Sequence, residues 1–166
     1  MEPTKTKTKT TTNPHVAAFV QVTDGDRHLL PVALHDLTHQ RDVNLDIVVL
    51  DRTTAGGLPE GEHTLVCLGP DCTSGDAHRV GLNFTRAKYI AWHLLSVRNL
   101  PTRMRIQSDY LDHNTSLSMV LTNLVLTDDS GRIVALANPA KAGAAPTPLW
   151  QGGVMLRRAA LARIGR

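Results

Sequence analysis

Residues 43–51 read VNLDIVVLD and give the clearest strand signal in the first half of the chain. Valine, isoleucine and leucine dominate this run, and such side chains pack well on the pleated surface of a sheet. Turn-forming residues flank it at Asp24-Gly25-Asp26 and at Ala55-Gly56-Gly57. The other segments that we expect to be strands in this half are residues 16–23, 27–36, 63–68 and 77–84, with Pro31 marking an edge or a bulge.

The second half shows a similar order of strands and turns. Residues 117–127 are its longest predicted strand, 128–131 (Asp-Asp-Ser-Gly) a tight hairpin turn, and 132–137 the returning strand. Residues 103–112 alternate apolar and polar side chains, as a half-buried strand does. Residues 90–97 fit a strand or a helix, and periodicity does not separate the two.

The two halves match in pattern at a constant offset. Val43 corresponds to Leu117, and Asn44 to Ser118, 74 positions further along the chain. We interpret this as an internal duplication, the alternative being a single larger barrel or sandwich with evenly spaced strands. The expected domains are 15–84 and 85–158, flanked by a disordered Lys/Thr tail at 1–14 and a basic tail at 159–166.

The ends of the chain are basic. Residues 1–14 carry three lysines and one glutamate, and residues 150–166 carry four arginines and no acid, so that the net charge of +3 hides a mildly acidic middle. This layout is typical of a chain whose tails contact phosphate, and also of tails that merely keep a small protein soluble.

Composition limits the class of protein. No apolar run approaches the roughly 20 residues that cross a bilayer, and residues 1–14 contain no apolar stretch of the kind that a secretory signal needs. Two cysteines and no export signal indicate a reducing compartment. We therefore expect an intracellular protein, in the nucleus, the cytoplasm or both, with no membrane partner.

The order of strands and loops resembles the Sm and Sm-like family, whose fold is a strongly bent five-stranded antiparallel barrel. Residues 43–51 resemble the first motif of the family, 117–127 are similar, and 150–156 (WQGGVML) resemble the second motif with Gln151 in place of arginine. The resemblance covers most of residues 16–158. It implies an all-β protein with two tandem small barrels of this kind and sheet edges that pair with Sm-type proteins or with other copies of the chain.

The same resemblance implies a component or assembly scaffold of a ribonucleoprotein particle, with single-stranded RNA as a second partner. Carried over by position, the base-stacking and base-edge residues would be Val43 and Asn44 in the first half and Leu117 and Ser118 in the second. Gln151 and Gly152 would hold the nucleotide. Arg103 and Arg105 would share one strand face and contact phosphate, unless that face is simply solvated.

The residues also leave other classes of function open. A viral or phage capsid or decoration protein, with a β-barrel and a basic arm, is the main alternative. His35, His39, Cys67 and Cys72 make a weak candidate zinc site, because their spacing allows four ligands but does not bring them together. The sequence shows no nucleophile elbow, phosphate-binding glycine loop or metalloprotease motif, so we expect no enzyme, no cofactor and no metal.

Overall fold

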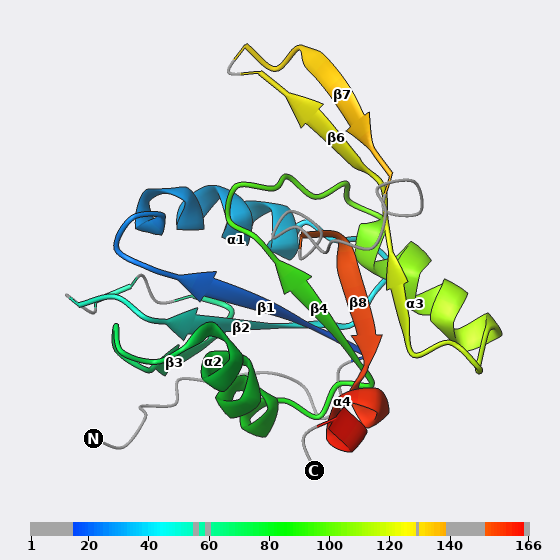
Figure 1. Cartoon of the computed structure of the whole chain (residues 1–166), viewed down its shortest axis with the longest axis horizontal. Coiled ribbons are helices and arrows are strands. Elements are labelled where there is room, and N and C mark those ends of the chain that lie inside the picture. Colours follow the sequence, from blue (N-terminus) through cyan, green and yellow to red (C-terminus); the bar gives the residue numbers. More distant parts are fainter. Residues whose placement is uncertain (1–14, 55–56, 59–60, 129, 139–151, 165–166) are drawn as a thin grey trace.

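A computed structural model of the chain describes residues 15–54, 57–58, 61–128, 130–138 and 152–164. They form one six-stranded sheet in the order β3-β2-β1-β4-β8-β5 and a separate two-stranded hairpin (Figure 1). The strands of the sheet are β1 (Val16–Val22), β2 (Leu45–Asp51), β3 (Thr64–Cys67), β4 (Tyr89–His93), β5 (Met119–Leu121) and β8 (Val154–Arg157). The hairpin consists of β6 (Leu124–Thr127) and β7 (Ile133–Ala137).

The centre of the sheet is parallel. Strands β1 to β4 all run in one direction, and β8 runs antiparallel between β4 and β5. Residues 16–20 of β1 are fully buried on both faces of the sheet, as expected for a central parallel strand covered by helices on each side.

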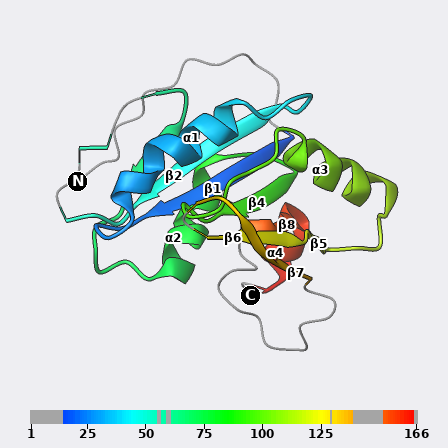
Figure 2. The same ribbon diagram turned by 90° about the horizontal axis from the view of Figure 1, so that it is seen from above.

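Helices cover both faces of the sheet (Figure 2). One face packs against α1 (Leu30–Thr38) and α3 (Arg103–His113), and the other against α2 (Ser74–Gly81) and α4 (Arg158–Ile164). Short 3-10 turns at Arg27–Leu29 and Leu82–Phe84 adjoin α1 and α2. Within the described ranges, none of the helices combines the length and the apolar character that a membrane crossing requires.

Local chemistry accounts for the starts of two helices. Pro31 lies in the first turn of α1, where its missing N–H would have no partner anyway. Thr73 caps α2, since its hydroxyl oxygen accepts a hydrogen bond from the Asp76 backbone N–H (3.1 Å) and its hydroxyl donates to the Asp76 carboxylate (2.7 Å). Gly81 lets the end of α2 approach the sheet, because a Cβ there would lie 3.0 Å from side-chain atoms of Leu50 and Phe19.

The prediction of an all-β protein with two tandem barrels is wrong. The structure is mixed α/β and 31% helical, and strands from both predicted halves share one sheet. The offset of 74 positions relates unlike elements, since β2 is a central parallel strand whereas β5 is an antiparallel strand at the edge. Residues 1–14, predicted to be a disordered tail, lie outside the described residues.

Three predicted strands are helical. Residues 27–36 contain the start of α1, 77–84 lie mostly in α2, and 103–112 belong to α3. In α3 the buried side chains recur with helical spacing, but several are polar, which concealed the period: Arg103, Met104, Gln107, Ser108 and Leu111. The predicted hairpin around 128–131 is confirmed, although residues 117–127 form two short strands.

Candidate functional site

The carboxyl ends of the parallel strands form the edge of the sheet where ligands bind in open α/β folds. After β1 the chain enters α1 on one face of the sheet, and after β3 it enters α2 on the opposite face. The order of strands therefore reverses between β1 and β4, and such a switch point leaves a crevice outside the strand ends.

A pocket of about 410 Å³ lies beside the end of β1. Its volume is within the range of small-molecule sites. The loop after β1 supplies its charged groups, and apolar side chains of α1 and of the loop after β2 supply the rest of the lining. The lining residues are Asp24, Arg27, His28, Leu30, Pro31 and Leu58.

Hydrogen bonds join the two loops that frame this pocket. The Asp24 carboxylate accepts bonds from the Thr54 backbone N–H (3.1 Å) and hydroxyl (3.0 Å). The Arg27 guanidinium donates to the Gly57 carbonyl (2.8 Å). The Arg52 backbone N–H donates to the Val22 carbonyl (2.9 Å) and extends the pairing of the strands into the loops. These bonds hold the charged groups of the pocket in a fixed relation before any ligand binds.

The pocket combines four kinds of chemical group. A carboxylate such as that of Asp24 accepts hydrogen bonds from hydroxyl and amino groups, and a guanidinium such as that of Arg27 presents several N–H donors that suit an anion. His28 adds an imidazole, and the apolar side chains offer a surface for a flat ring. A ligand that carries a ring, hydroxyl groups and a negative charge would match this lining.

A buried polar network closes the end of β4. His93 lies at the last position of that strand, and its Nδ1 is 2.6 Å from Asn99 Nδ2. Burial lowers the pKa of His93 to about 4, with Arg103 contributing, so the imidazole is neutral at pH 7. Its Nε2 is buried and has no hydrogen-bond partner among the residues that the structure describes.

Arg103 joins three elements at this end of the sheet. From the start of α3 its guanidinium donates to the Asn99 side-chain oxygen (2.5 Å), to the Gln107 side-chain oxygen (3.1 Å), and to the carbonyls of Trp92 and Val154 (both 3.3 Å). Burial lowers its pKa to about 10, which leaves it charged at pH 7. The network thus fixes the loop that follows β4.

An ion pair holds the same loop against α1. Arg98 donates from Nε and Nη2 to the two oxygens of Asp36 (2.7 and 2.8 Å), and the Asn99 backbone N–H also donates to Asp36 (3.1 Å). The hydrogen bonds from Arg98 lower the pKa of Asp36 against the opposing effect of burial. The Asp36 side chain is buried, whereas Arg98 is largely exposed. The ion pair therefore anchors the loop to a fixed, buried group of α1.

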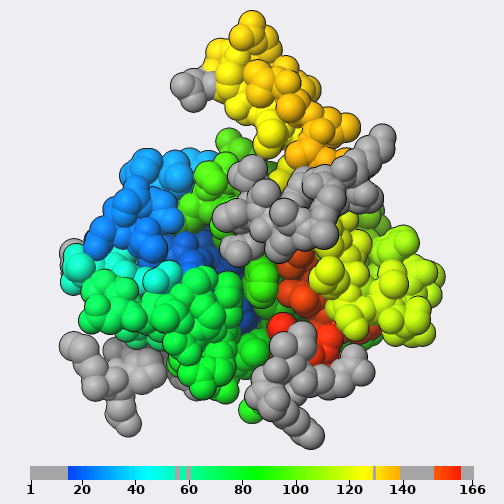
Figure 3. Space-filling model, in the orientation of Figure 1, coloured from blue at the N-terminus to red at the C-terminus, as the bar shows by residue number. Residues whose placement is uncertain are grey.

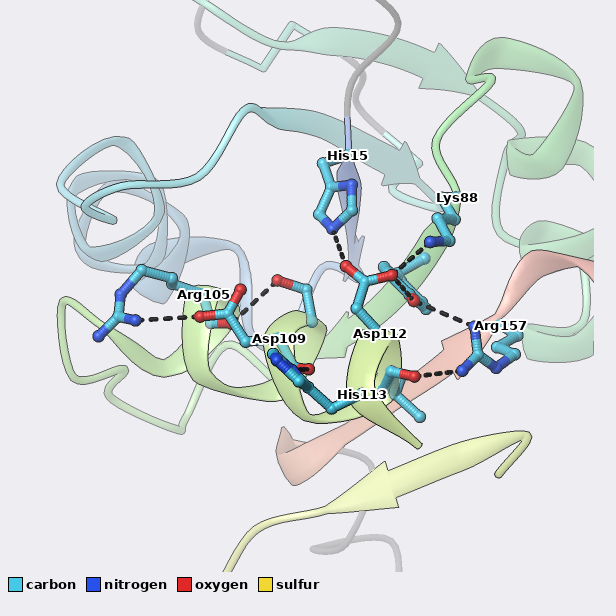
Figure 4. Close-up of polar contacts among 10 residues, drawn as sticks. His15, Lys88, Arg105, Asp109, Asp112, His113 and Arg157 are labelled. Carbon is cyan, nitrogen blue, oxygen red and sulfur yellow. Dashed lines mark hydrogen bonds and ion pairs between the residues drawn. The ribbon is translucent and has the colours of Figure 1, made fainter. Parts of the chain in front are cut away.

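A second polar cluster lies at the opposite, amino edge of the sheet (Figure 4). Asp112 of α3 accepts hydrogen bonds from His15 Nε2 (3.0 Å), from Lys88 and from the Tyr89 hydroxyl (2.7 Å). Arg157 of β8 donates to the Tyr89 hydroxyl (3.0 Å) and to the Leu111 carbonyl at the end of α3. Because ligands of open α/β folds bind at the carboxyl edge of the sheet, we interpret this cluster at the amino edge as structural, joining α3 to β4 and β8.

The residues predicted to bind RNA have varied surroundings in the structure. Val43 and Asn44 precede β2 at the amino edge, where the Asn44 carbonyl accepts hydrogen bonds from the backbone N–H groups of residues 15 and 16. The carbonyls of Leu117 and Ser118 accept hydrogen bonds from Arg157 at the edge of the sheet.

The other predicted contacts to RNA also have different surroundings. Arg103 is buried in the network described above, and Arg105 forms an ion pair with Asp109 (3.0 Å) one turn along α3, so the two arginines share no strand face. Gly152 is buried against Val97, where a Cβ would approach to 2.8 Å, and Gln151 lies outside the described residues.

The weak candidate zinc ligands are divided between the two edges. His35 and His39 lie near the end of α1 at the amino edge, with ring centroids 4.0 Å apart. Cys67 ends β3 at the carboxyl edge, and Cys72 precedes α2. Across the described part of the chain, no group of three or more histidine, cysteine or acidic side chains is placed to hold a metal ion.

Sequence reasoning missed the pocket residues. The sequence pattern indicates only a turn at Asp24 and predicts a strand over Arg27 and His28. The signal that could have found them is a strand, a turn and a proline-initiated helix in succession, which is the pattern of a ligand-binding loop in α/β folds.

No family model matches the chain, and no curated protein matches it. Among solved structures, residues 1–349 of S. aureus TarS superpose with a TM-score of 0.61 at 12% identity, covering 90% of this chain and 49% of that one. A longer structure of S. aureus TarS gives a TM-score of 0.51 at 12% identity, covering 72% of this chain and 23% of that one. The chain thus spans about half, or less, of the proteins that it resembles.

TarS is a wall teichoic acid glycosyltransferase, and this likeness corrects the functional predictions. The RNA-associated Sm-like protein, the capsid protein and the expectation of no enzyme are all contradicted by a fold found in an enzyme of this class. What the two superpositions establish is that this chain shares the fold of part of S. aureus TarS.

Proposed function

We propose that this chain is the donor-binding domain of a glycosyltransferase, and that it takes a nucleoside diphosphate sugar in the pocket beside β1. The observation that carries the proposal is the position of this pocket, at the carboxyl ends of β1 and β2 in a sheet whose fold resembles part of TarS. Transfer of a sugar breaks the bond between its anomeric carbon and a phosphate oxygen and forms a bond to an acceptor hydroxyl. A donor of this kind carries a ring, hydroxyl groups and negative charge together.

Each part of the donor has a matching group in the pocket. Leu30, Pro31 and Leu58 would contact the base, and Asp24 would accept hydrogen bonds from ribose hydroxyls. Arg27 would pair with the diphosphate, since charge-assisted bonds to phosphate are the stronger kind. The ties from Asp24 to Thr54 and from Arg27 to Gly57 keep these groups in place before the donor arrives.

Isothermal titration calorimetry of the whole chain with UDP, GDP, ADP and CDP, each with and without Mg²⁺, tests the proposal. We expect saturable binding of at least one diphosphate. Arg27→Met should weaken that binding by about tenfold or more, because one charge-assisted hydrogen bond contributes about 1.5–3 kcal/mol. The same variant should change the affinity for the corresponding nucleoside much less, since the nucleoside has no phosphate.

A matched control separates the pocket from a general loss of positive charge. Arg79 of α2 is an exposed arginine paired with Asp76, on the opposite face of the sheet, and Arg79→Met should leave binding unchanged. If none of the diphosphates binds, or if the two variants bind equally well, the pocket is not the donor site.

A further inference from the structure

Two histidines lie side by side on the outer surface of α1. The helix forms part of the molecular surface in the space-filling view, where it is coloured blue (Figure 3). His35 lies in α1 and His39 caps its end, and both are exposed. Their ring centroids are 4.0 Å apart and their planes are tilted by 36°. Residues four positions apart on a helix project from the same face, so the helix itself brings these two rings together.

A hydrogen bond fixes which ring nitrogen of His39 is free. Its Nδ1 is 2.7 Å from the His35 carbonyl oxygen. A carbonyl oxygen only accepts, so Nδ1 carries the proton, and the neutral imidazole keeps its lone pair on Nε2. Histidines that bind metal ions usually have this arrangement, with the second ring N–H donated to a carboxylate or a backbone carbonyl. The bond therefore prepares the His39 ring to act as a ligand.

The second imidazole is also free to bind. Among the residues that the structure describes, no hydrogen bond or ion pair engages the ring nitrogens of His35. The neighbouring Asp36 is not a ligand, because its buried carboxylate is paired with Arg98 (2.7 Å). In the described ranges no third histidine, cysteine or acidic side chain joins the two rings, so water would fill the other coordination positions.

Two imidazoles select the kind of ion. Imidazole suits Zn²⁺, Ni²⁺ and Cu²⁺, whereas Mg²⁺ and Ca²⁺ require oxygen ligands. A zinc–nitrogen bond is about 2.0–2.1 Å long. Rings 4.0 Å apart can both reach one ion after small rotations, which exposed side chains make freely. We propose that His35 and His39 together bind one divalent transition metal ion, through one ring nitrogen each.

This site is separate from the pocket beside β1. Neither histidine belongs to the lining of that pocket. Metal binding at the histidine pair therefore does not depend on the proposed binding of a nucleoside diphosphate sugar, and either proposal can fail without the other.

NMR of the imidazole C–H groups of the full chain, titrated with NiCl₂, tests the proposal residue by residue. Paramagnetic Ni²⁺ broadens the signals of nearby nuclei, so the signals of His35 and His39 should disappear first and together. The free cysteines Cys67 and Cys72 can bind Ni²⁺ as well, but they lie elsewhere in the fold and do not account for broadening at these two rings. Excess MgCl₂ should leave the broadening unchanged.

His113 provides a matched control. It is also exposed, and its Nδ1 is 2.7 Å from the carbonyl of Asp109, four positions earlier, as in the histidine pair. The side chain at that earlier position is a carboxylate paired with Arg105 (3.0 Å), so His113 has no imidazole neighbour there. Its signal should broaden only at higher Ni²⁺ concentrations.

Isothermal titration calorimetry with NiCl₂ and ZnCl₂ measures the contribution of each ring. His35→Ala and His39→Ala should each weaken this binding by about tenfold or more, because the remaining imidazole loses the gain from two linked ligands. His113→Ala should leave it unchanged, and thermal melts followed by circular dichroism check that all three variants are folded. Equal binding by His39→Ala and the unmodified protein, broadening of His113 at the same Ni²⁺ concentration as the pair, or displacement of Ni²⁺ by Mg²⁺ would each overturn the proposal.

Discussion

Replacement of Arg103 by methionine tests whether the end of β4 is held by a structural network. Methionine keeps most of the length of the side chain but removes four donated hydrogen bonds, to Asn99, Gln107 and the carbonyls of Trp92 and Val154. The two side-chain amides can turn toward other partners, whereas the two carbonyls are fixed by the backbone.

The magnitude follows from those two carbonyls. A buried acceptor that loses its partner costs about 1–3 kcal/mol, so we expect Arg103→Met to lower the free energy of unfolding by about 3 kcal/mol. Arg103 is a buried cation that contacts no carboxylate in the described structure, so its burial carries an uncompensated desolvation cost. Methionine removes that cost, which limits the loss in the free energy of unfolding. Arg103→Lys should lose nearly as much, because a single ammonium group cannot span α3, β4 and β8.

Urea denaturation at pH 7 measures this loss as a shift of the midpoint at constant slope. Arg105→Met serves as the control, since Arg105 makes a partly exposed ion pair with Asp109 worth about 0.5 kcal/mol or less. An Arg103→Met variant within about 1 kcal/mol of the unmodified protein, or equal to Arg105→Met, would refute the account of the network.

Two further predictions concern pH. The imidazole of His78 stacks with the rings of Phe19 and Trp92. Burial lowers the pKa of His78 from 6.5 to about 4 in the folded protein. As the pH falls, the unfolded chain therefore takes up this proton first, and the free energy of unfolding should decrease between pH 6.5 and 4. In His78→Phe this fall should be smaller by up to about 3 kcal/mol, which urea midpoints across that range would show, and parallel curves would contradict it. Burial opposes the ionisation of Asp112, but the hydrogen bonds that its carboxylate accepts lower its pKa from 3.8 to about 2. The ionised Asp112 therefore stabilises the fold above pH 3.8, and this stabilisation is lost as the pH falls toward 2. Asp112→Asn should therefore cost about 1 kcal/mol at pH 7, after allowance for its partial exposure, and the difference from the unmodified protein should shrink toward pH 2 in the same titration.

The apolar strands were the part of the fold that could be predicted from sequence. The strands predicted at residues 16–23, 43–51 and 63–68 are confirmed as β1, β2 and β3, because a continuous apolar run is a direct signal of a buried strand. Such runs do not reveal direction, and the parallel arrangement was missed because the helices between the strands were not recognised. The strand predicted at residues 27–36 is wrong because Pro31 is compatible both with the edge of a sheet and with the first turn of a helix, and here it lies in the first turn of α1.

The candidate site could not be predicted from the sequence, for a related reason. Asp24 and Arg27 become neighbours of Leu58 only when β1 and β2 pair in parallel, and nothing in the spacing of these residues indicates that. In α3 the polar side chains of Arg103, Gln107 and Ser108 are buried, so a pattern based on hydrophobicity cannot show which face is inside. Their burial depends on hydrogen bonds to other elements.

Strand β8 has a consequence for how the chain folds. It comes from residues 154–157, yet it lies between β4 and β5 and is the only strand that pairs with β5 in the described structure. During synthesis, β1 to β4 can assemble as soon as they have been made. Strand β5 can join the sheet only after β8 has been synthesised, more than thirty residues later in the chain. Premature termination before residue 154 would leave an unpaired edge on β4 and a nascent chain prone to aggregate.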